Sequence, residues 1–320
     1  MRILVALGGN ALLRRSERPD AAIQRRHVAD AARSLAKLAT EHTLVICHGN
    51  GPQIGVLASE SESDPALSAP YGLDVLGAQT QGMIGYWLVQ ELANAGVVGE
   101  LAALVTQTEV SPSDPAMSSP SKFIGPSHDA RSADALRAER GWDFALDGQV
   151  LRRVVPSPDP VGVVELESIR RLVTQGATVI CGGGGGVPVV RTADGTLAGV
   201  PAVVDKDLTA SLLSVALDAD RFLVLTDVAA VMSDFGGPHE KAITVIDVAE
   251  VNALRLPRGS MGPKVEACAR FVHATGRRAS IGALEESGAV LAGDAGTTLI
   301  PSCGSDLDGF GAAGLGADHA

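Results

Sequence analysis

Short apolar runs that end in glycine alternate with helical patterns along most of this chain. Three runs lead directly into glycine turns: Ile3–Leu7 before Gly8-Gly9-Asn10, Leu44–Cys47 before Gly49-Asn50-Gly51, and Ala177–Cys181 before the five glycines 182–186. Alternation of buried strands with helices is typical of a mostly parallel sheet covered on both faces. We therefore predict an α/β fold in which ligands bind beyond the carboxyl ends of the strands.

Apolar residues three and four positions apart predict the helices. The clearest helical segments are Arg25–Glu41, Gly72–Ala95 and Glu165–Gln175, and Val245–Leu254 is also expected to be helical. Further strands are expected at Leu101–Val105, Arg221–Thr226, Ala279–Ile281 and Thr297–Ile300. Val187–Arg191 and Thr196–Val200, joined through Asp194-Gly195, predict a hairpin.

The stretch 199–217 carries a charged triplet between two apolar patterns. Val200–Val204 predicts a buried strand, and Leu208, Leu212, Val215 and Ala216 are spaced as one face of a helix. Asp205-Lys206-Asp207 stands between them. A lysine fixed by two carboxylates suits an anionic transition state. The triplet also fits an ordinary helix start, with Asp207 as the N-cap and Lys206 in solvent, and the residues alone leave both interpretations open.

The two glycine turns in the first 55 residues favour one shared cradle for an anion, because glycine lets backbone N–H groups approach a phosphate closely. Neither turn matches the dinucleotide motif G-x-G-x-x-G or the Walker P-loop, which disfavours a dehydrogenase. His48, before the second turn, is either a general base or a ring that supports the turn. The run of glycines at 182–186 predicts a backbone surface lying against a ligand.

Residues 111–160 differ from the rest of the chain in being rich in Pro, Ser, Asp and Arg. This composition predicts an excursion from the core that forms a small lid. Lys122 lies within it beside an apolar pair, and Arg152-Arg153 is either a second anion site or a surface pair. Lys264 follows Pro263 in the first turn of a predicted helix, where the macrodipole disfavours a cation. Lys264 is therefore either exposed or directed at an anion.

Composition excludes several classes of protein. The net charge of −11 over 320 residues argues against a surface for nucleic acid or an anionic membrane. The four cysteines are far apart, without the spacing of a metal site or a disulfide framework, and no metal-ligating residues are assigned. No apolar run suggests a signal peptide or a membrane helix, so a cytoplasmic protein is expected.

Several motifs together resemble those of the carbamate kinases, within the amino-acid kinase superfamily. They are ALGGNAL at 6–12, HGNGPQIG at 48–55, TQTEV at 106–110, SKFIGP at 121–126, RRVVPSPDP at 152–160, ICGGGGGVPVV at 180–190, VDKDL at 204–208 and GSMGPK at 259–264. The resemblance runs from Arg2 to about Pro301. It implies a three-layer α/β/α sandwich over residues 1–304 with a protruding lid subdomain at about 111–160. Beyond it, the composition of residues 305–320, rich in Gly, Ala and Asp, predicts a disordered tail.

The resemblance also implies an activity and a set of site residues. The expected reaction is reversible phosphoryl transfer between carbamoyl phosphate and ADP, giving ATP and carbamate, with Mg²⁺ and in a homodimer. Lys206 and Lys264 are expected to be the cations on the phosphates, with Asp207 as their organiser and Lys122 reaching from the lid. The expected cradle is Gly8, Gly9, Asn10, Gly49, Asn50 and Gly51, and the expected nucleotide neighbours are Gly183, Gly184, Gly185, Thr226, Asp227 and Met232.

The chain departs from the family pattern at two places. Phe123 stands where the lid motif usually has Pro, and Ser127-His128 stands where it has aromatics. An aromatic common near the adenine loop is replaced around Ala229–Asp234. Two alternatives are a sister kinase that phosphorylates another small carboxylate and a nucleotide-binding regulatory protein without catalysis. The sister kinase would need a further cation in its pocket. The regulatory protein is disfavoured because the chain retains Lys206, Asp207 and Lys264 together.

Overall fold

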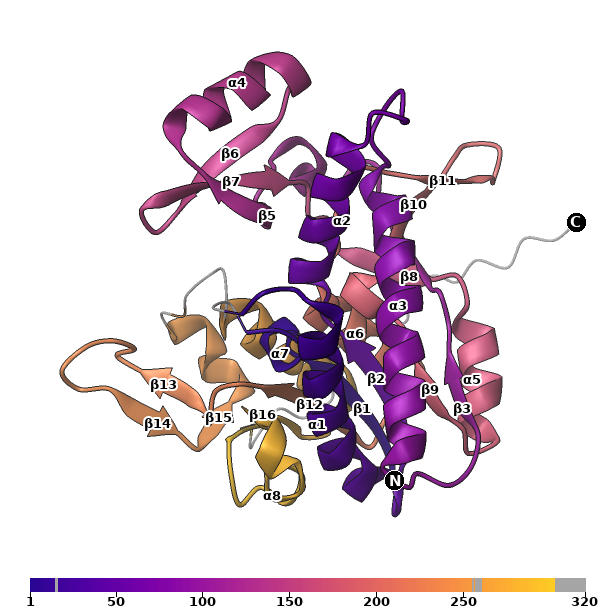
Figure 1. The fold of residues 1–320 in the computed structure, drawn as a ribbon. Helices are drawn as coiled ribbons and strands as arrows, with labels where there is room; N and C mark the ends of the chain where they lie inside the picture. Colours follow the sequence, from indigo (N-terminus) through magenta and orange to yellow (C-terminus); the bar gives the residue numbers. More distant parts are fainter. Residues whose placement is uncertain (15–16, 255, 257–260, 303–320) are drawn as a thin grey trace, which may run out of the picture.

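The computed structural model describes residues 1–14, 17–254, 256 and 261–302. Its centre is an eight-stranded sheet (Figure 1). In spatial order the strands are β15 (Val245–Asp247), β17 (Thr297–Ile300), β16 (Ala279–Ala283), β12 (Arg221–Thr226), β1 (Arg2–Leu7), β2 (Thr43–His48), β9 (Thr178–Ile180) and β3 (Leu101–Ala103). The pairing of β16 with β17 is antiparallel and the other pairings are parallel, so the predicted mostly parallel sheet is confirmed.

Helices cover both faces of this sheet. On one face lie α1 (Ala21–Ala39), α3 (Leu73–Asn94) and α8 (Ser287–Ala292), and on the other lie α5 (Leu166–Thr174), α6 (Lys206–Ala216) and α7 (Met261–Thr275). Alternate residues of a strand point to opposite faces. In β1, Leu4 and Ala6 accordingly enter one core, whereas Ile3, Val5 and Leu7 enter the other. The chain is therefore the three-layer α/β/α sandwich that the sequence predicted.

Two further sheets flank the central one. β11 (Leu197–Gly199), β10 (Val187–Arg191), β4 (Gln107–Val110) and β8 (Pro160–Val163) form the first, in that order. β13 (Val231–Ser233) and β14 (Lys241–Ile243) form an antiparallel pair after β12. The predicted hairpin of β10 and β11 is confirmed. None of the described helices is long and apolar enough to cross a membrane.

Residues 122–155 form a separate small unit, which we call the projecting unit. Its antiparallel sheet contains β5 (Lys122–His128), β7 (Val150–Val155) and β6 (Asp143–Asp147), and α4 (Ala130–Arg140) packs on that sheet. Figure 1 shows this unit beside α2 (Gly51–Ser63), away from the central sheet. β5 is irregular between Ile124 and Ser127, where Gly125 has a positive φ of 65°.

The strand expected at Val200–Val204 is wrong. The backbone N–H of Val200 donates to Pro188 and that of Val203 donates to Pro156, so the segment bonds to two different parts of the chain instead of one neighbouring strand. Pro201 has no N–H to donate. The segment remains extended and delivers Asp205 to the start of α6.

The expected buried face of α6 is also wrong. Leu208 and Leu212 are only partly buried and Val215 is exposed, whereas small and polar residues such as Ala210, Ser211 and Ser214 are buried. Their size lets α6 lie close to α7, and Ser211 Oγ donates to the Ala267 carbonyl at 2.8 Å. The helix expected at Val245–Leu254 is replaced by β15 and the 3₁₀ helix η4 (Val248–Ala253).

Three of the four cysteines lie within the described residues. Cys47, Cys181 and Cys268 are buried free thiols that pack as small apolar residues, as expected of the first two. Burial and a neighbouring thiol at Cys47 raise the pKa of Cys181, which makes it a poor nucleophile. The fourth cysteine and the predicted tail at 305–320 lie outside the described residues.

Candidate active site

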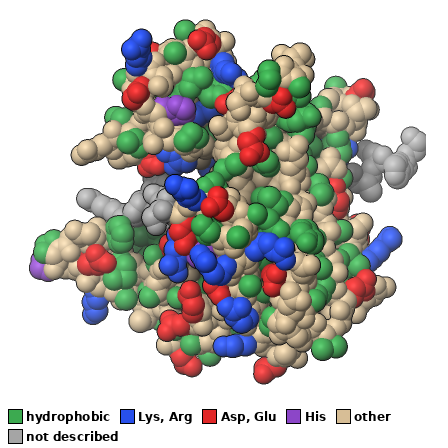
Figure 2. Space-filling model, viewed as in Figure 1, with side chains coloured by type: hydrophobic (Ala, Val, Ile, Leu, Met, Phe, Trp, Pro, Cys, Tyr) green, Lys and Arg blue, Asp and Glu red, His purple; other side chains and the backbone are tan. Residues whose placement is uncertain are grey.

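A large hollow lies at the carboxyl ends of the central strands, between the projecting unit and the main body. It is a cavity of about 1110 Å³. The ends of β1, β2 and β12 contribute residues to its wall, as does the start of α6. Figure 2 shows Lys and Arg side chains gathered below the notch that separates the two parts. This is the position predicted for ligands in an α/β fold.

The two glycine turns meet in one wall of this cavity. Gly8, Gly9, Gly49, Asn50 and Gly51 all line it. A Cβ on Gly49 would lie 2.9 Å from the backbone nitrogen of Gly9, so the two turns touch only because glycine occupies this position. The side-chain amide of Asn50 donates to Thr80 Oγ1 at 2.8 Å. The side chain of Asn10 lies outside the described residues.

His48 supports the glycine turn and does not line the cavity. Its ring is buried, and Nδ1 lies 3.0 Å from the carbonyl oxygen of Gly49. Burial lowers the pKa of His48 to about 4, so the ring is neutral at physiological pH. A Cβ on Gly183 would lie 2.3 Å from its Nε2, which shows how closely the glycine run packs on the ring. The geometry favours the supporting role over the general base.

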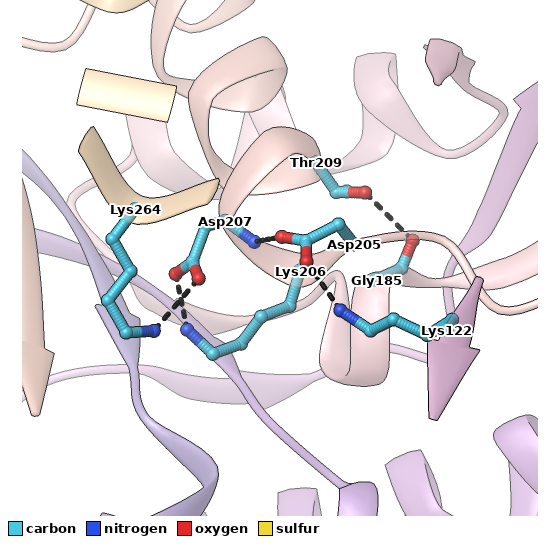
Figure 3. Close-up of polar contacts among 7 residues, drawn as sticks. All are labelled: Lys122, Gly185, Asp205, Lys206, Asp207, Thr209 and Lys264. Carbon is cyan, nitrogen blue, oxygen red and sulfur yellow. Dashed lines mark hydrogen bonds and ion pairs between the residues drawn. The ribbon is translucent and has the colours of Figure 1, made fainter. Parts of the chain in front are cut away.

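Asp207, at the start of α6, contacts the ammonium groups of two lysines through its carboxylate (Figure 3). Lys206 contacts Oδ1 of Asp207, and Lys264, from the first turn of α7, lies 3.0 Å from Oδ2 of the same residue. Asp207 is only 3% exposed. The N-cap of α6 is Asp205, whose Oδ1 accepts from the backbone N–H of Asp207 at 2.9 Å. The capping role proposed for Asp207, and the solvated position proposed for Lys206, are both wrong.

Burial and charge compete in setting the pKa values of this cluster. Burial alone would raise the pKa of Asp207, but the charges of Lys206 and Lys264 outweigh it and hold that pKa far below its usual value. Burial lowers the pKa of Lys206, and Lys264 adds repulsion. For Lys264 the attraction of Asp207 outweighs burial and raises the pKa. The two lysines differ because Lys206 is the more deeply buried one.

Lys122 brings a third ammonium group to the cavity from the projecting unit. Its Nζ lies 2.5 Å from Oδ2 of Asp205, across 83 positions of sequence. The chain contains five lysines, and the other two, Lys37 and Lys241, are exposed elsewhere. Three of the five therefore converge on one cavity in a chain that otherwise uses arginine for its positive charges.

The glycines after β9 mainly allow neighbouring segments of the chain to pack closely against them. Of the three glycines predicted to adjoin a nucleotide, Gly184 lines the cavity, whereas Gly183 and Gly185 do not. A Cβ on Gly185 would lie 2.1 Å from the carbonyl oxygen of Val204, and its own carbonyl accepts from Thr108 and Thr209 (Figure 3). Of the glycines predicted to adjoin a nucleotide, Gly184 is thus the one in the cavity wall, and its contact with a nucleotide stays a prediction.

The segment after β12 gives the cavity a partly apolar end, which contains Met232 beside the polar residues Thr226 and Asp227. Thr226 Oγ1 donates to Asp227 at 3.0 Å. Sequence reasoning missed Phe235, which also lines the cavity and is 69% exposed. It lies just beyond the segment Ala229–Asp234 in which an aromatic was sought. Leu256 and Met261 add further apolar surface at this end.

Comparison with known proteins shows the family to which this chain belongs. A model of the Amino acid kinase family matches residues 1–283. Carbamate kinase of Rhizobium meliloti is 46% identical over 310 residues, or 96% of this chain and 95% of that protein. Carbamate kinase of Escherichia coli K12 is 46% identical over 297 residues, or 93% and 98% of the two chains. The chain belongs to the amino acid kinase family, among its carbamate kinases.

A solved structure agrees with this assignment. Carbamate kinase from Giardia lamblia bound to AMP-PNP matches this amino acid kinase with a TM-score of 0.85 at 36% identity. The match covers 94% of this chain and 98% of that one. The family resemblance inferred from the motifs is therefore confirmed.

The two arginines of the predicted anion pair in this kinase have different surroundings, and of the two only Arg152 lines the cavity. Arg152 donates to the carbonyl oxygen of Gly125 through Nε and Nη2, and to Asp147 at 2.9 Å through Nη1. Arg153 stacks on Trp142 at 3.7 Å and lies 3.6 Å from Glu62 of α2. Arg152 is therefore a cation at the cavity wall that is held by contacts within the projecting unit, whereas Arg153 joins that unit to α2. The anion site stays a prediction for Arg152.

Sequence reasoning also missed Arg14 and the capping role of Asp205. Arg14 lines the cavity, and its backbone N–H donates to Glu17, whose other contact is with His27 of α1. With Arg152, Arg14 adds a cation to the cavity wall of the kind that the sister kinase would need. The signal for Asp205 was available, because Asp is a favoured N-cap residue and Asp205 directly precedes the helical pattern.

Proposed function

We propose that this kinase transfers a phosphoryl group reversibly between carbamoyl phosphate and ADP, giving carbamate and ATP. One observation carries the proposal: three ammonium groups, fixed by Asp205 and Asp207, surround a cavity whose wall is made of two glycine turns. Phosphoryl transfer requires positive charge and donors around the moving group, and little covalent chemistry from the protein. The relatives named carbamate kinase, at 46% identity, support this choice of substrate.

In this proposal each part of the cavity has a separate task. Gly8, Gly9, Asn10, Gly49, Asn50 and Gly51 bind carbamate and the transferred group, partly through backbone N–H groups. Lys206 and Lys264 neutralise the charge on the phosphoryl oxygens, and Asp207 keeps them oriented. A terminal phosphate oxygen of ADP then forms a bond to phosphorus as the bond from phosphorus to the carbamate oxygen breaks.

The nucleotide occupies the partly apolar end of the cavity in this proposal. Thr226, Asp227 and Met232 adjoin it, with Gly184 nearer the phosphates and Gly183 and Gly185 supporting Gly184 from behind. The AMP-PNP complex of the Giardia lamblia relative supports an adenine nucleotide as the ligand. Mg²⁺ enters with the nucleotide, because it commonly binds through substrate phosphates and water. Among the described residues, no three His, Cys, Asp or Glu side chains gather where they could hold a metal ion.

The projecting unit is proposed to act as the lid expected at about 111–160, with Lys122 as its contribution to the closed site.

We further propose that residues 1–304 form one kinase domain, that the protein is a homodimer and that it is cytoplasmic. These three parts of the proposal rest on the family resemblance. Light scattering on the purified full chain measures the dimer directly. A monomer mass at micromolar concentration would contradict it.

A coupled assay of ATP formation tests the activity. Purified protein is supplied with ADP and carbamoyl phosphate, with and without Mg²⁺, and in parallel with acetyl phosphate, or with N-acetylglutamate plus ATP. We expect ATP from carbamoyl phosphate only when Mg²⁺ is present. Faster turnover of another acid would identify the sister kinase, for which Arg14 supplies the further cation. Folded protein without turnover on any substrate would indicate the regulatory protein.

A further inference from the structure

Asp205 uses its two carboxylate oxygens for two different parts of the molecule. Oδ1 accepts from the backbone N–H of Asp207 at 2.9 Å and so caps α6. Oδ2 lies 2.5 Å from Nζ of Lys122, on the first residue of β5 in the projecting unit (Figure 3). One buried side chain, 7% exposed, therefore joins the helix that carries Lys206 to the lysine of the projecting unit.

Few charged contacts hold the projecting unit to the main body. Among the described residues only two ion pairs make this connection, Lys122 with Asp205 and Arg153 with Glu62. The second lies at the far end of α2 and outside the cavity. The pair of Lys122 with Asp205 is thus the one that fixes a cavity-lining cation across the gap between the two parts.

We propose that Asp205 is a positioning residue, which holds the ammonium of Lys122 at the cavity in register with Lys206 and Asp207. This inference rests on the proposed phosphoryl transfer. A lysine side chain has four flexible bonds and three N–H donors. One donor is satisfied by Asp205, which fixes the side chain and leaves the remaining donors for an anionic substrate. Asp205 itself needs no contact with the substrate.

A purely structural role for Asp205 makes a different prediction. Asn is as good an N-cap as Asp, so Asp205→Asn preserves the bond to the Asp207 N–H. With the Asn oxygen used for the cap, its NH₂ group faces the ammonium of Lys122, and two donors cannot bond to each other. Asp205→Asn therefore separates the cap from the ion pair. Asp205→Ser is a second such variant, because Ser caps well but has no atom in the place of Oδ2.

The kinetic test is a double-mutant cycle on ATP formation from carbamoyl phosphate and ADP. We expect Asp205→Asn to lower kcat about 10-fold. Loss of Lys122 itself should lower kcat more, because removal of one preorganised donor lowers kcat by a factor of about 10²–10³. On a Lys122→Met background the same change should alter kcat less than 2-fold, because residues that act as a unit are not additive. Wild-type kcat in Asp205→Asn and Asp205→Ser, or a full 10-fold loss on the Lys122→Met background, would overturn the proposal.

Asp247→Asn is the matched control for the cycle. Asp247 caps η4 by accepting from the Ala249 N–H at 2.9 Å and does not line the cavity. It is expected to keep wild-type kcat and KM. A loss of kcat in Asp247→Asn equal to that in Asp205→Asn would show a general effect of weakened caps and would also overturn the proposal.

A second measurement does not depend on activity. Limited acetic anhydride acylates exposed amines, and peptide mapping by mass spectrometry gives the rate at each lysine. In the wild type we expect Lys122 to react more slowly than the exposed Lys37 and Lys241. In Asp205→Asn we expect Lys122 to react several-fold faster than it does in the wild type. An unchanged rate at Lys122 would overturn the positioning role. A wild type that shows this protection but forms no ATP would instead refute the proposed function.

Discussion

The ammonium of Lys264 lies 3.0 Å from Oδ2 of Asp207, while Lys206 contacts the other oxygen of the same carboxylate. Two positive charges are thereby held close together inside the protein, which their mutual repulsion would otherwise prevent. The carboxylate compensates one charge and leaves a net positive field directed at the cavity. Breaking a buried arrangement of this kind leaves an uncompensated charge.

Removal of either lysine should abolish most turnover. We expect Lys206→Ala and Lys264→Ala each to lower kcat by about 10²–10³. Asp207→Ala should do comparable damage, because the two ammonium groups then repel each other and lose their alignment. The double variant Lys206→Ala/Asp207→Ala should be little worse than Lys206→Ala. Turnover is measured at saturating ADP and carbamoyl phosphate.

Exposed lysines provide the control for this series. Lys37→Ala and Lys241→Ala change the same residue type far from the cavity and should retain wild-type turnover. Fully additive losses in the double variant would mean that Asp207 acts independently of Lys206. Near-normal activity in Lys206→Ala or Lys264→Ala would remove that lysine from the site.

His48 should make stability depend on pH between about 4 and 6.5. Its folded pKa of about 4 lies below the unfolded value of 6.5, so the unfolded chain binds the extra proton first as pH falls. Stability from the neutral ring is complete above pH 6.5 and is lost on acidification through the folded pKa, by about 3 kcal/mol in all. Urea unfolding at pH 4 to 7 measures this loss.

Two variants identify His48 as the source of that dependence. His48→Gln should flatten the pH profile of stability in this window, whereas His273→Gln, at an exposed position, should leave it unchanged. The Cε1 proton of His48 should also keep its neutral NMR shift at pH 5. A titration midpoint near 6.5 would show that the ring is hydrated and would contradict the burial argument.

Local periodicity was enough to predict the sheet and the meeting of the glycine turns. β1, β2 and β12 are continuous apolar runs because both of their faces are buried, and parallel neighbours bring their carboxyl ends to one edge. This is why Gly9 and Gly49, 40 positions apart, could be placed together. The prediction failed for α6 because small polar residues such as Thr209 and Ser211 are buried on it, beside Ala210 and Leu213, and bond to the backbone of neighbouring segments.

The residues that sequence reasoning missed depend on contacts between distant segments. Asp205 is recognised as the partner of Lys122 only when the projecting unit is placed over α6, which no local pattern specifies. Phe235 follows the short strand β13, and its place in the cavity wall depends on how the pair β13 and β14 is placed beside segments distant in sequence, such as Lys122 and Lys264, which line the same cavity. Arg152 and Arg153 appear as a basic pair in sequence, yet they bond to different partners because alternate residues of β7 face opposite sides.

Phe235 should contribute to nucleotide binding more than to chemistry. We expect Phe235→Ala to raise KM for ADP about 5- to 10-fold with kcat within 2-fold of wild type, because a lost apolar contact of about 1–1.5 kcal/mol that is the same in the ground and transition states affects KM alone. Val98→Ala, at a position that is 96% exposed, is the control. An unchanged KM for ADP would show that the adenine of ADP does not bind against Phe235.

Gly55 should set how closely the projecting unit seats on α2. A Cβ at this position would lie 2.9 Å from Cα of Gly125, a backbone atom that cannot rotate away, so Gly55→Ala must push β5 and its Lys122 outward. We expect kcat/KM for carbamoyl phosphate to fall 10-fold or more. The matched control is Gly82→Ala in α3, where nothing lies within 4 Å and the change should only stabilise the helix, by about 0.5–1 kcal/mol. Thermal unfolding of both variants separates a displaced unit from a damaged fold. Wild-type kinetics in Gly55→Ala would show that catalysis does not depend on this close seat.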